Sequence, residues 1–142
     1  MLADCPICNA YAPELRRIAG QYDGQGVALR VVHVDPDLSV AAAARHADLY
    51  ELPGPVLWDP AQVLVDFSGA TMAPEVVIVD SRAQVVYRGR IDNLYAGWGK
   101  RRAEATSHDL RDALDAVLRG QSPVESSVPP IGCYLPKGSP GS

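Results

Sequence analysis

The segment 26–34 restricts the fold of this 142-residue chain more than any other feature. It reads Gly-Val-Ala-Leu-Arg-Val-Val-His-Val, which is almost wholly apolar and rich in β-branched valine. A near-continuous apolar run of this kind predicts a strand that is covered on both faces. The next three residues, Asp35-Pro36-Asp37, end the strand because they favour a turn.

The rest of the chain alternates between helical periodicity and short β-branched runs. Helices are expected over 5–20, 39–50, 59–67 and about 106–119, and strands over 56–58, 75–80 and 84–91. Pro13 predicts a kink in the first helix, and the segment 92–105 is expected to be a polar loop. The predicted fold class is therefore α/β, with a mixed central sheet and helices on both faces.

The composition is that of a globular domain, with 47% hydrophobic and 21% charged residues. A net charge of −4 gives no general attraction to nucleic acid, so no nucleic-acid partner is expected. No apolar run reaches the ~18 residues of a membrane span. We expect one domain over 1–120, followed by a tail over 121–142 that is rich in Pro, Ser and Gly.

Two cysteines stand three residues apart in Cys5-Pro6-Ile7-Cys8, at the start of the first predicted helix. The unpaired N–H groups and the dipole of a helix N-terminus stabilise a thiolate there. A thiolate is the attacking species in thiol–disulfide exchange. We therefore expect Cys5 to be the nucleophile and Cys8, one turn further on, to be the resolving thiol.

A CxxC pair can also be half of a zinc site. The three histidines are scattered along the chain, although Cys133 with one of them could complete such a site. Because no second CxxC or HxxxH motif is present, redox chemistry is favoured and no metal or other cofactor is predicted.

Three segments together resemble a known family. Cys-Pro-Ile-Cys-Asn-Ala-Tyr-Ala-Pro-Glu resembles the active-site helix of thioredoxin-like proteins, and 69–75 followed by a strand resembles their cis-proline loop. Tyr-Arg-Gly-Arg-Ile-Asp over 87–92 and the last helix also match. In detail the chain is similar to the bacterial redoxins of the AhpC/TSA (alkyl hydroperoxide reductase and thiol-specific antioxidant) superfamily.

The resemblance implies a thioredoxin-like fold in which the Ala73–Pro74 bond is cis and faces the Cys5 sulfur. The backbone of Ala73 would then be free to pair with an extended substrate strand. Cys5, Cys8 and Pro74 are the implied catalytic residues. Asp4 stands where thioredoxins usually carry Trp, and its carboxylate would either oppose the thiolate or cap the helix.

The family also places a central strand directly before the active-site helix. Only Met1-Leu2-Ala3 precede Asp4, fewer than the ~5 residues of a normal strand. We therefore expect this N-terminal strand to be missing or truncated, unless another strand or chain fills its place.

Four further residues have two interpretations each. Cys133 is either a third redox thiol, brought to Cys5 by a tail that folds back, or a thiol that only docks the tail. Many relatives carry Ser where Cys8 stands, so Cys133 is also an alternative partner for Cys5. Glu14 and Glu75 could relay protons, although simple hydrogen bonds or surface roles are favoured. For His33, a core position is favoured over a proton shuttle.

The predicted function is a thiol–disulfide oxidoreductase that acts on protein dithiols or disulfides through a Cys5–Cys8 disulfide, without a cofactor. One alternative is a thiol peroxidase in which Cys5 attacks a peroxide. The other is a non-catalytic module that binds a metal or a partner protein. The resemblance to bacterial redoxins leaves both an extracytoplasmic and a cytoplasmic location open, and the oligomeric state is left open as well.

Overall fold

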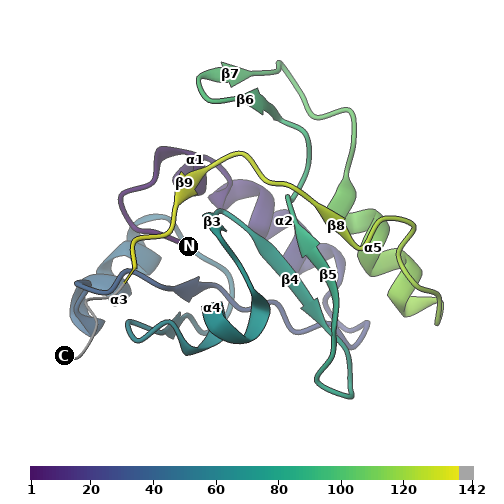
Figure 1. Cartoon of the computed structure of the whole chain (residues 1–142), viewed down its shortest axis with the longest axis horizontal. Coiled ribbons are helices and arrows are strands. Elements are labelled where there is room, and N and C mark those ends of the chain that lie inside the picture. Colours follow the sequence, from purple (N-terminus) through teal and green to yellow (C-terminus); the bar gives the residue numbers. More distant parts are fainter. Residues whose placement is uncertain (138–142) are drawn as a thin grey trace.

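The computed structural model describes residues 1–137 (Figure 1). Its helices are α1 (Pro6–Ala10), α2 (Ala12–Gln21), α3 (Val40–Leu49), α4 (Val63–Ser68) and α5 (Asp109–Leu118). Its strands are β1 (Val32–His33), β2 (Leu57–Trp58), β3 (Met72–Ala73), β4 (Val76–Val79), β5 (Val85–Gly89), β6 (Tyr95–Gly97), β7 (Lys100–Arg101), β8 (Ser127–Val128) and β9 (Cys133–Tyr134).

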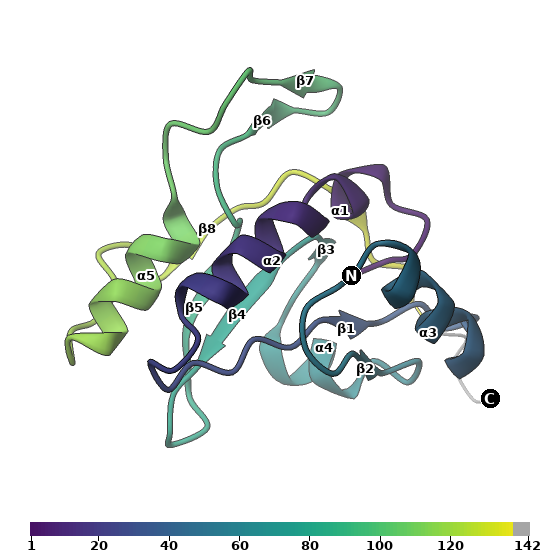
Figure 2. The same cartoon turned by 180° about the vertical axis from the view of Figure 1, so that it is seen from behind.

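The sheet has a central antiparallel hairpin. β4 pairs with β5 so that Val76 lies opposite Gly89, and β8 from the tail joins the other edge of β5 in parallel. β1 and β2 form a separate parallel pair. α2 and α5 cover one face of β4 and β5 (Figure 2). α4 lies on the opposite side, in front in the reverse view of Figure 1. The predicted α/β class, with a mixed sheet and helices on both faces, is confirmed.

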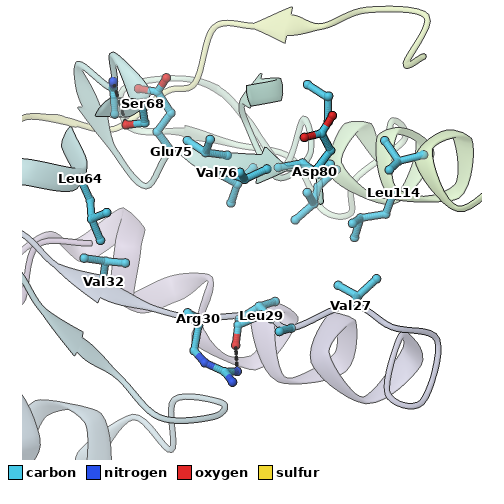
Figure 3. A pocket seen from close by; sticks show the side chains of 18 of the residues that line it. Val27, Leu29, Arg30, Val32, Leu64, Ser68, Glu75, Val76, Asp80 and Leu114 are labelled. Atoms are coloured by element: carbon cyan, nitrogen blue, oxygen red, sulfur yellow. Dashed lines mark hydrogen bonds between the residues drawn. The ribbon is translucent and has the colours of Figure 1, made fainter. Parts of the chain in front are cut away.

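A cavity of about 930 Å³ separates the β1–β2 pair from β4. Val27, Leu29 and Val32 face it from one side and Val76 from the other (Figure 3). Met1 also lines this cavity, and its amine donates to the Val32 carbonyl at 2.7 Å.

This gap also explains why the strand predicted over 26–34 is short. Only Val32 and His33 are strand residues, paired with β2. Val34 donates a backbone hydrogen bond to the Met1 carbonyl at 3.1 Å, as in a parallel ladder. Residues 27–31 border the cavity instead, and within residues 1–137 no strand pairs with them on that side.

The first predicted helix is two helices in the structure. α1 ends at Ala10 and α2 begins at Ala12, with Tyr11 between them. The break comes before Pro13, which has no N–H and whose ring would clash with the preceding turn of a continuous helix. The predicted disturbance is therefore confirmed, but it lies at Tyr11.

Two helices begin later than predicted. α4 begins at Val63, and both oxygens of Asp59 cap it by accepting from the backbone N–H groups of Val63 and Leu64, at 2.9 and 2.8 Å. Gln62, directly before α4, has a left-handed backbone with φ 57°, so no helix can run through it from Pro60. α5 likewise begins late, at Asp109.

Residues 92–105 are not only a loop. β6 and β7 form a hairpin that projects from the body of the molecule (Figure 1), and its turn contains Gly99 with φ +70°. The tail is likewise more ordered than predicted, because β8 and β9 both dock on the body. Residues 138–142, the end of the predicted tail, lie outside the described part of the chain.

Candidate redox site

Cys5 is the N-cap residue of α1. Its backbone is extended, with φ −82° and ψ 114°, and Pro6 follows at the first helical position. Its sulfur accepts a hydrogen bond from the Cys8 backbone N–H at 3.4 Å. Asp4, the predicted cap, is exposed, and the sulfur takes its place.

The Cys5 thiol is much more acidic than an ordinary cysteine. A hydrogen bond from the Cys8 side chain lowers its pKa to about 5 against the opposing effect of burial, with further help from Cys133 and from the backbone N–H groups of Cys8 and Ile7. Donors that point at a sulfur favour its charged form. The site therefore holds Cys5 as a thiolate at neutral pH.

Cys8 is held in the opposite state. It is fully buried, and its pKa is raised well above the usual range, first by the hydrogen bond to Cys5 and then by burial. Two thiols one helical turn apart thus have different roles: an anion at the helix start and a protonated donor behind it. Both are free thiols in the structure.

The second part of the site is the loop between β3 and β4. The Ala73–Pro74 bond is cis, as the resemblance implies. The Cys5 sulfur lies 3.5 Å from the Ala73 carbonyl oxygen, so this loop lies directly against the sulfur.

Glu75 stabilises the same loop rather than a thiol. One of its oxygens accepts from the backbone N–H groups of Thr71 and Met72, at 3.0 and 3.2 Å. The other pairs with Arg88 at 3.4 Å. These contacts fix the backbone that faces Cys5 and explain why Glu75 follows the proline.

Glu14 pairs with two arginines rather than with a thiol. It forms ion pairs with Arg17 on its own helix and with Arg111 on α5. Within residues 1–137, no hydrogen bond joins Glu14 or Glu75 to a thiol. The structure gives both carboxylates structural partners instead of the proton-relay role considered for them.

The third cysteine comes to the site from the tail. β9 pairs antiparallel with β3, and Cys133 lies opposite Ala73. Burial, and then the neighbouring Cys5, together raise the pKa of Cys133 to about 12. Ala73 is therefore not free to accept a substrate strand, because the chain's own tail occupies its edge.

Beside α1 lies a chain of polar side chains that the sequence did not reveal. The ring of His33 is fully buried and contacts His46 (Nε2 to Nδ1, 2.8 Å), and His46 Nε2 lies 2.8 Å from Asn9 Oδ1. Asn9 in turn donates to the Ala3 carbonyl at 3.0 Å. The segment that leads into Cys5 is thus fixed to α3. The predicted core position of His33 is confirmed.

Tyr11 is a second buried anchor that sequence reasoning missed. Its hydroxyl donates to the Asp92 carboxylate at 2.6 Å, and burial followed by this carboxylate raises its pKa. Both residues are almost fully buried. Because Tyr11 lies at the break between α1 and α2, the contact fixes the angle of the cysteine-bearing helix.

In residues 1–137, no group of three or more His, Cys, Asp or Glu side chains is arranged to hold a metal ion. Over the same residues, no helix is both long and apolar enough to cross a membrane.

Comparison with known proteins identifies relatives of this site. The model of the AhpC/TSA family matches residues 1–88. Over 83 residues the chain is 28% identical to the thiol-disulfide oxidoreductase ResA of Halalkalibacterium halodurans. The matched stretch covers 58% of this chain and 46% of that protein. The chain thus spans about half the length of this curated relative.

Solved structures extend the likeness. A hypothetical protein from Sinorhizobium meliloti 1021 superposes with a TM-score of 0.82 at 30% identity, over 99% of this chain and 78% of that one. A Chlorobium tepidum chain described as a thiol:disulfide interchange protein DsbE superposes with a TM-score of 0.54 at 17% identity, over 61% and 60%, which shows the fold alone. With the fold, the cis-proline loop and the family match in agreement, the chain is a thioredoxin-like redoxin and belongs to the AhpC/TSA family.

Proposed function

We propose that this protein is a thiol–disulfide oxidoreductase that exchanges electrons with protein dithiols and disulfides through Cys5 and Cys8. The observation that carries the proposal is the Cys5 sulfur capping α1 with Cys8 directly behind it. The family match and the similarity to ResA support the same chemistry.

In the first step the Cys5 thiolate attacks one sulfur of a substrate disulfide. A bond forms between Cys5 Sγ and that sulfur, and the other substrate sulfur leaves as a thiolate and takes up a proton. In the second step Cys8 loses its proton and attacks Cys5 Sγ, which releases the second substrate thiol. The substrate gains two electrons, and the protein is left with a Cys5–Cys8 disulfide.

The electrostatics of the pair fit this order of events. The main cause that raises the pKa of Cys8 is its hydrogen bond to Cys5. Once Cys5 carries the substrate sulfur it is neutral, so that cause is removed and Cys8 becomes more acidic. Cys8 is therefore held protonated until the mixed disulfide exists, and it becomes a nucleophile only then.

The test is insulin-disulfide reduction with dithiothreitol as electron donor. Wild type should accelerate precipitation of the insulin B chain, and Cys5→Ser should lower the rate to background. Cys8→Ser should still attack once, so mass spectrometry should find a substrate joined to Cys5. If wild type gives no more than the background rate and Cys8→Ser traps no substrate, the proposal is wrong.

A thiol peroxidase is the second candidate, because the family to which the chain belongs is the AhpC/TSA family. Cys5 thiolate would attack the O–O bond, become a sulfenic acid and release water or an alcohol; a second thiol would then condense with it and release water. Peroxide consumption measured beside insulin reduction separates the two activities.

A further inference from the structure

The tail of this protein crosses the body and ends at the redox site. β8 adds to β5, and the chain then runs to β9, which pairs with β3 next to α1 (Figure 1). Leu135 prolongs this pairing by donating to the Thr71 carbonyl at 3.3 Å. A segment 60 residues away in sequence is thus held in extended form along the cis-proline loop.

The fit is close enough to require a particular residue. A Cβ added to Gly132 would overlap the carbonyl group of Ala73 and also meet the Pro74 ring at 3.0 Å. Only glycine allows the tail backbone to come this near. The contact is backbone against backbone, and it places the next residue, Cys133, opposite Ala73.

Cys5 and Cys133 therefore both lie beside Ala73. The Cys5 sulfur lies 3.5 Å from the Ala73 oxygen, and Cys133 pairs with Ala73 across the ladder. An extended peptide that adds to a free sheet edge, with side chains presented at alternate positions, is a common mode of peptide recognition. The tail uses this mode, and it presents a cysteine to the nucleophile.

We propose that Cys133 is an internal substrate of the Cys5–Cys8 centre, and that β9 occupies the edge of β3 where an external cysteine-bearing strand would bind. This inference rests on the proposed thiol–disulfide exchange at Cys5. It assigns to the β3 edge a class of ligand: an extended segment in which glycine precedes cysteine.

The reaction needs no further oxidant once the protein holds a Cys5–Cys8 disulfide. The Cys133 thiol loses its proton and attacks Cys5 Sγ, a Cys5–Cys133 bond forms, and Cys8 leaves as a thiolate that takes up a proton. One disulfide is exchanged for another, with no net change in electrons. The oxidised protein is then a mixture of two disulfide isomers.

External protein substrates must displace the tail. The tail competes with an external substrate at a high effective concentration, because it belongs to the same chain. β9 is only two residues long, so few backbone hydrogen bonds must break to release it. Release of β9 would free the pairing edge of β3, which lies beside the buried Cys5. The tail therefore acts as a competitor that favours small oxidants while it is docked.

The first experiment maps disulfides after treatment with oxidised glutathione, by non-reducing digestion and mass spectrometry. Cys8→Ser should give a Cys5–Cys133 disulfide, formed when Cys133 displaces glutathione from Cys5. If Cys8→Ser instead ends with glutathione on Cys5 and a free Cys133, the internal-substrate proposal is overturned. In that case the proposed function still stands, provided wild type forms Cys5–Cys8 and reduces insulin.

The second experiment removes the docking but keeps all three thiols. In the Cys8→Ser background, Gly132→Ala should lower the Cys5–Cys133 fraction about tenfold, equivalent to ~1.4 kcal/mol. In the wild-type background it should raise the initial rate of insulin reduction. Gly20→Ala is the matched control, because an added Cβ there meets nothing within 4 Å. Equal cross-linking in both variants would contradict docking as the cause.

Discussion

The backbone N–H of Cys8 points at the Cys5 sulfur and donates to it at 3.4 Å. One helical turn therefore both separates the two thiols and lets the second residue stabilise the anion of the first. With the Cys8 side chain as the largest influence, the pKa of Cys5 falls to about 5 while that of Cys8 rises.

The first prediction concerns alkylation of the reduced protein by iodoacetamide. Because the thiolate is the reactive form, Cys5 should be modified already near pH 6, with a rate that increases around pH 5. Cys8 should stay unmodified through pH 8. Peptide mapping by mass spectrometry gives both rates, and equal or reversed reactivity of the two residues would contradict their assigned roles.

The second prediction concerns stability at mildly acidic pH. Burial, and then the neighbouring His46, lower the pKa of His33 to about 4 from an ordinary value of 6.5. The unfolded chain therefore binds this proton first, so the free energy of unfolding should fall as the pH drops from 6.5 to 4.

Urea unfolding over that pH range measures the effect. His33→Gln should be less stable than wild type at pH 7, because a fully buried ring is replaced. Its stability should nevertheless decline less between pH 6.5 and 4, since the titrating group is gone. Parallel pH profiles for the two proteins would show that His33 is not the source.

The third prediction concerns the anchor at the helix break. Tyr11→Phe removes the hydroxyl that donates to Asp92 and leaves a buried carboxylate with fewer donors. The expected loss in free energy of unfolding is about 1.5–3 kcal/mol, the usual value for a hydrogen bond to a charged group. Tyr134→Phe is the matched control, since Tyr134 is 83% exposed. Denaturant unfolding of both variants should show a loss in Tyr11→Phe only.

The fourth prediction concerns the start of α4. Asp59→Ala removes both capping bonds, to the N–H groups of Val63 and Leu64. We expect a loss of about 1–2 kcal/mol in thermal or denaturant unfolding. Asp37→Ala, at an exposed position in the turn after β1, should change stability by less than about 0.5 kcal/mol. Similar losses in both would mean that the cap is not what stabilises α4.

Much of the fold was accessible to sequence reasoning because the signals are local. The β4–β5 hairpin follows from β-branched runs on either side of a turn, and α3 from an alanine-rich segment whose cap, Ser39, accepts from the Ala42 N–H at 3.1 Å. The start of α4 was misplaced because the left-handed backbone of Gln62 leaves no pattern in neighbouring residues.

The same division holds for the site. The sequence by itself determined that two thiols three residues apart begin a helix, because that signal lies within a few residues. The loop at Pro74 that faces them came from the resemblance to a family. Only the tertiary structure decided that Cys133 lies opposite Ala73, that the rings of His33 and His46 contact each other, and that a cavity separates the β1–β2 pair from β4. Each of these depends on packing between segments far apart in the chain, and no local spacing of residues encodes such contacts.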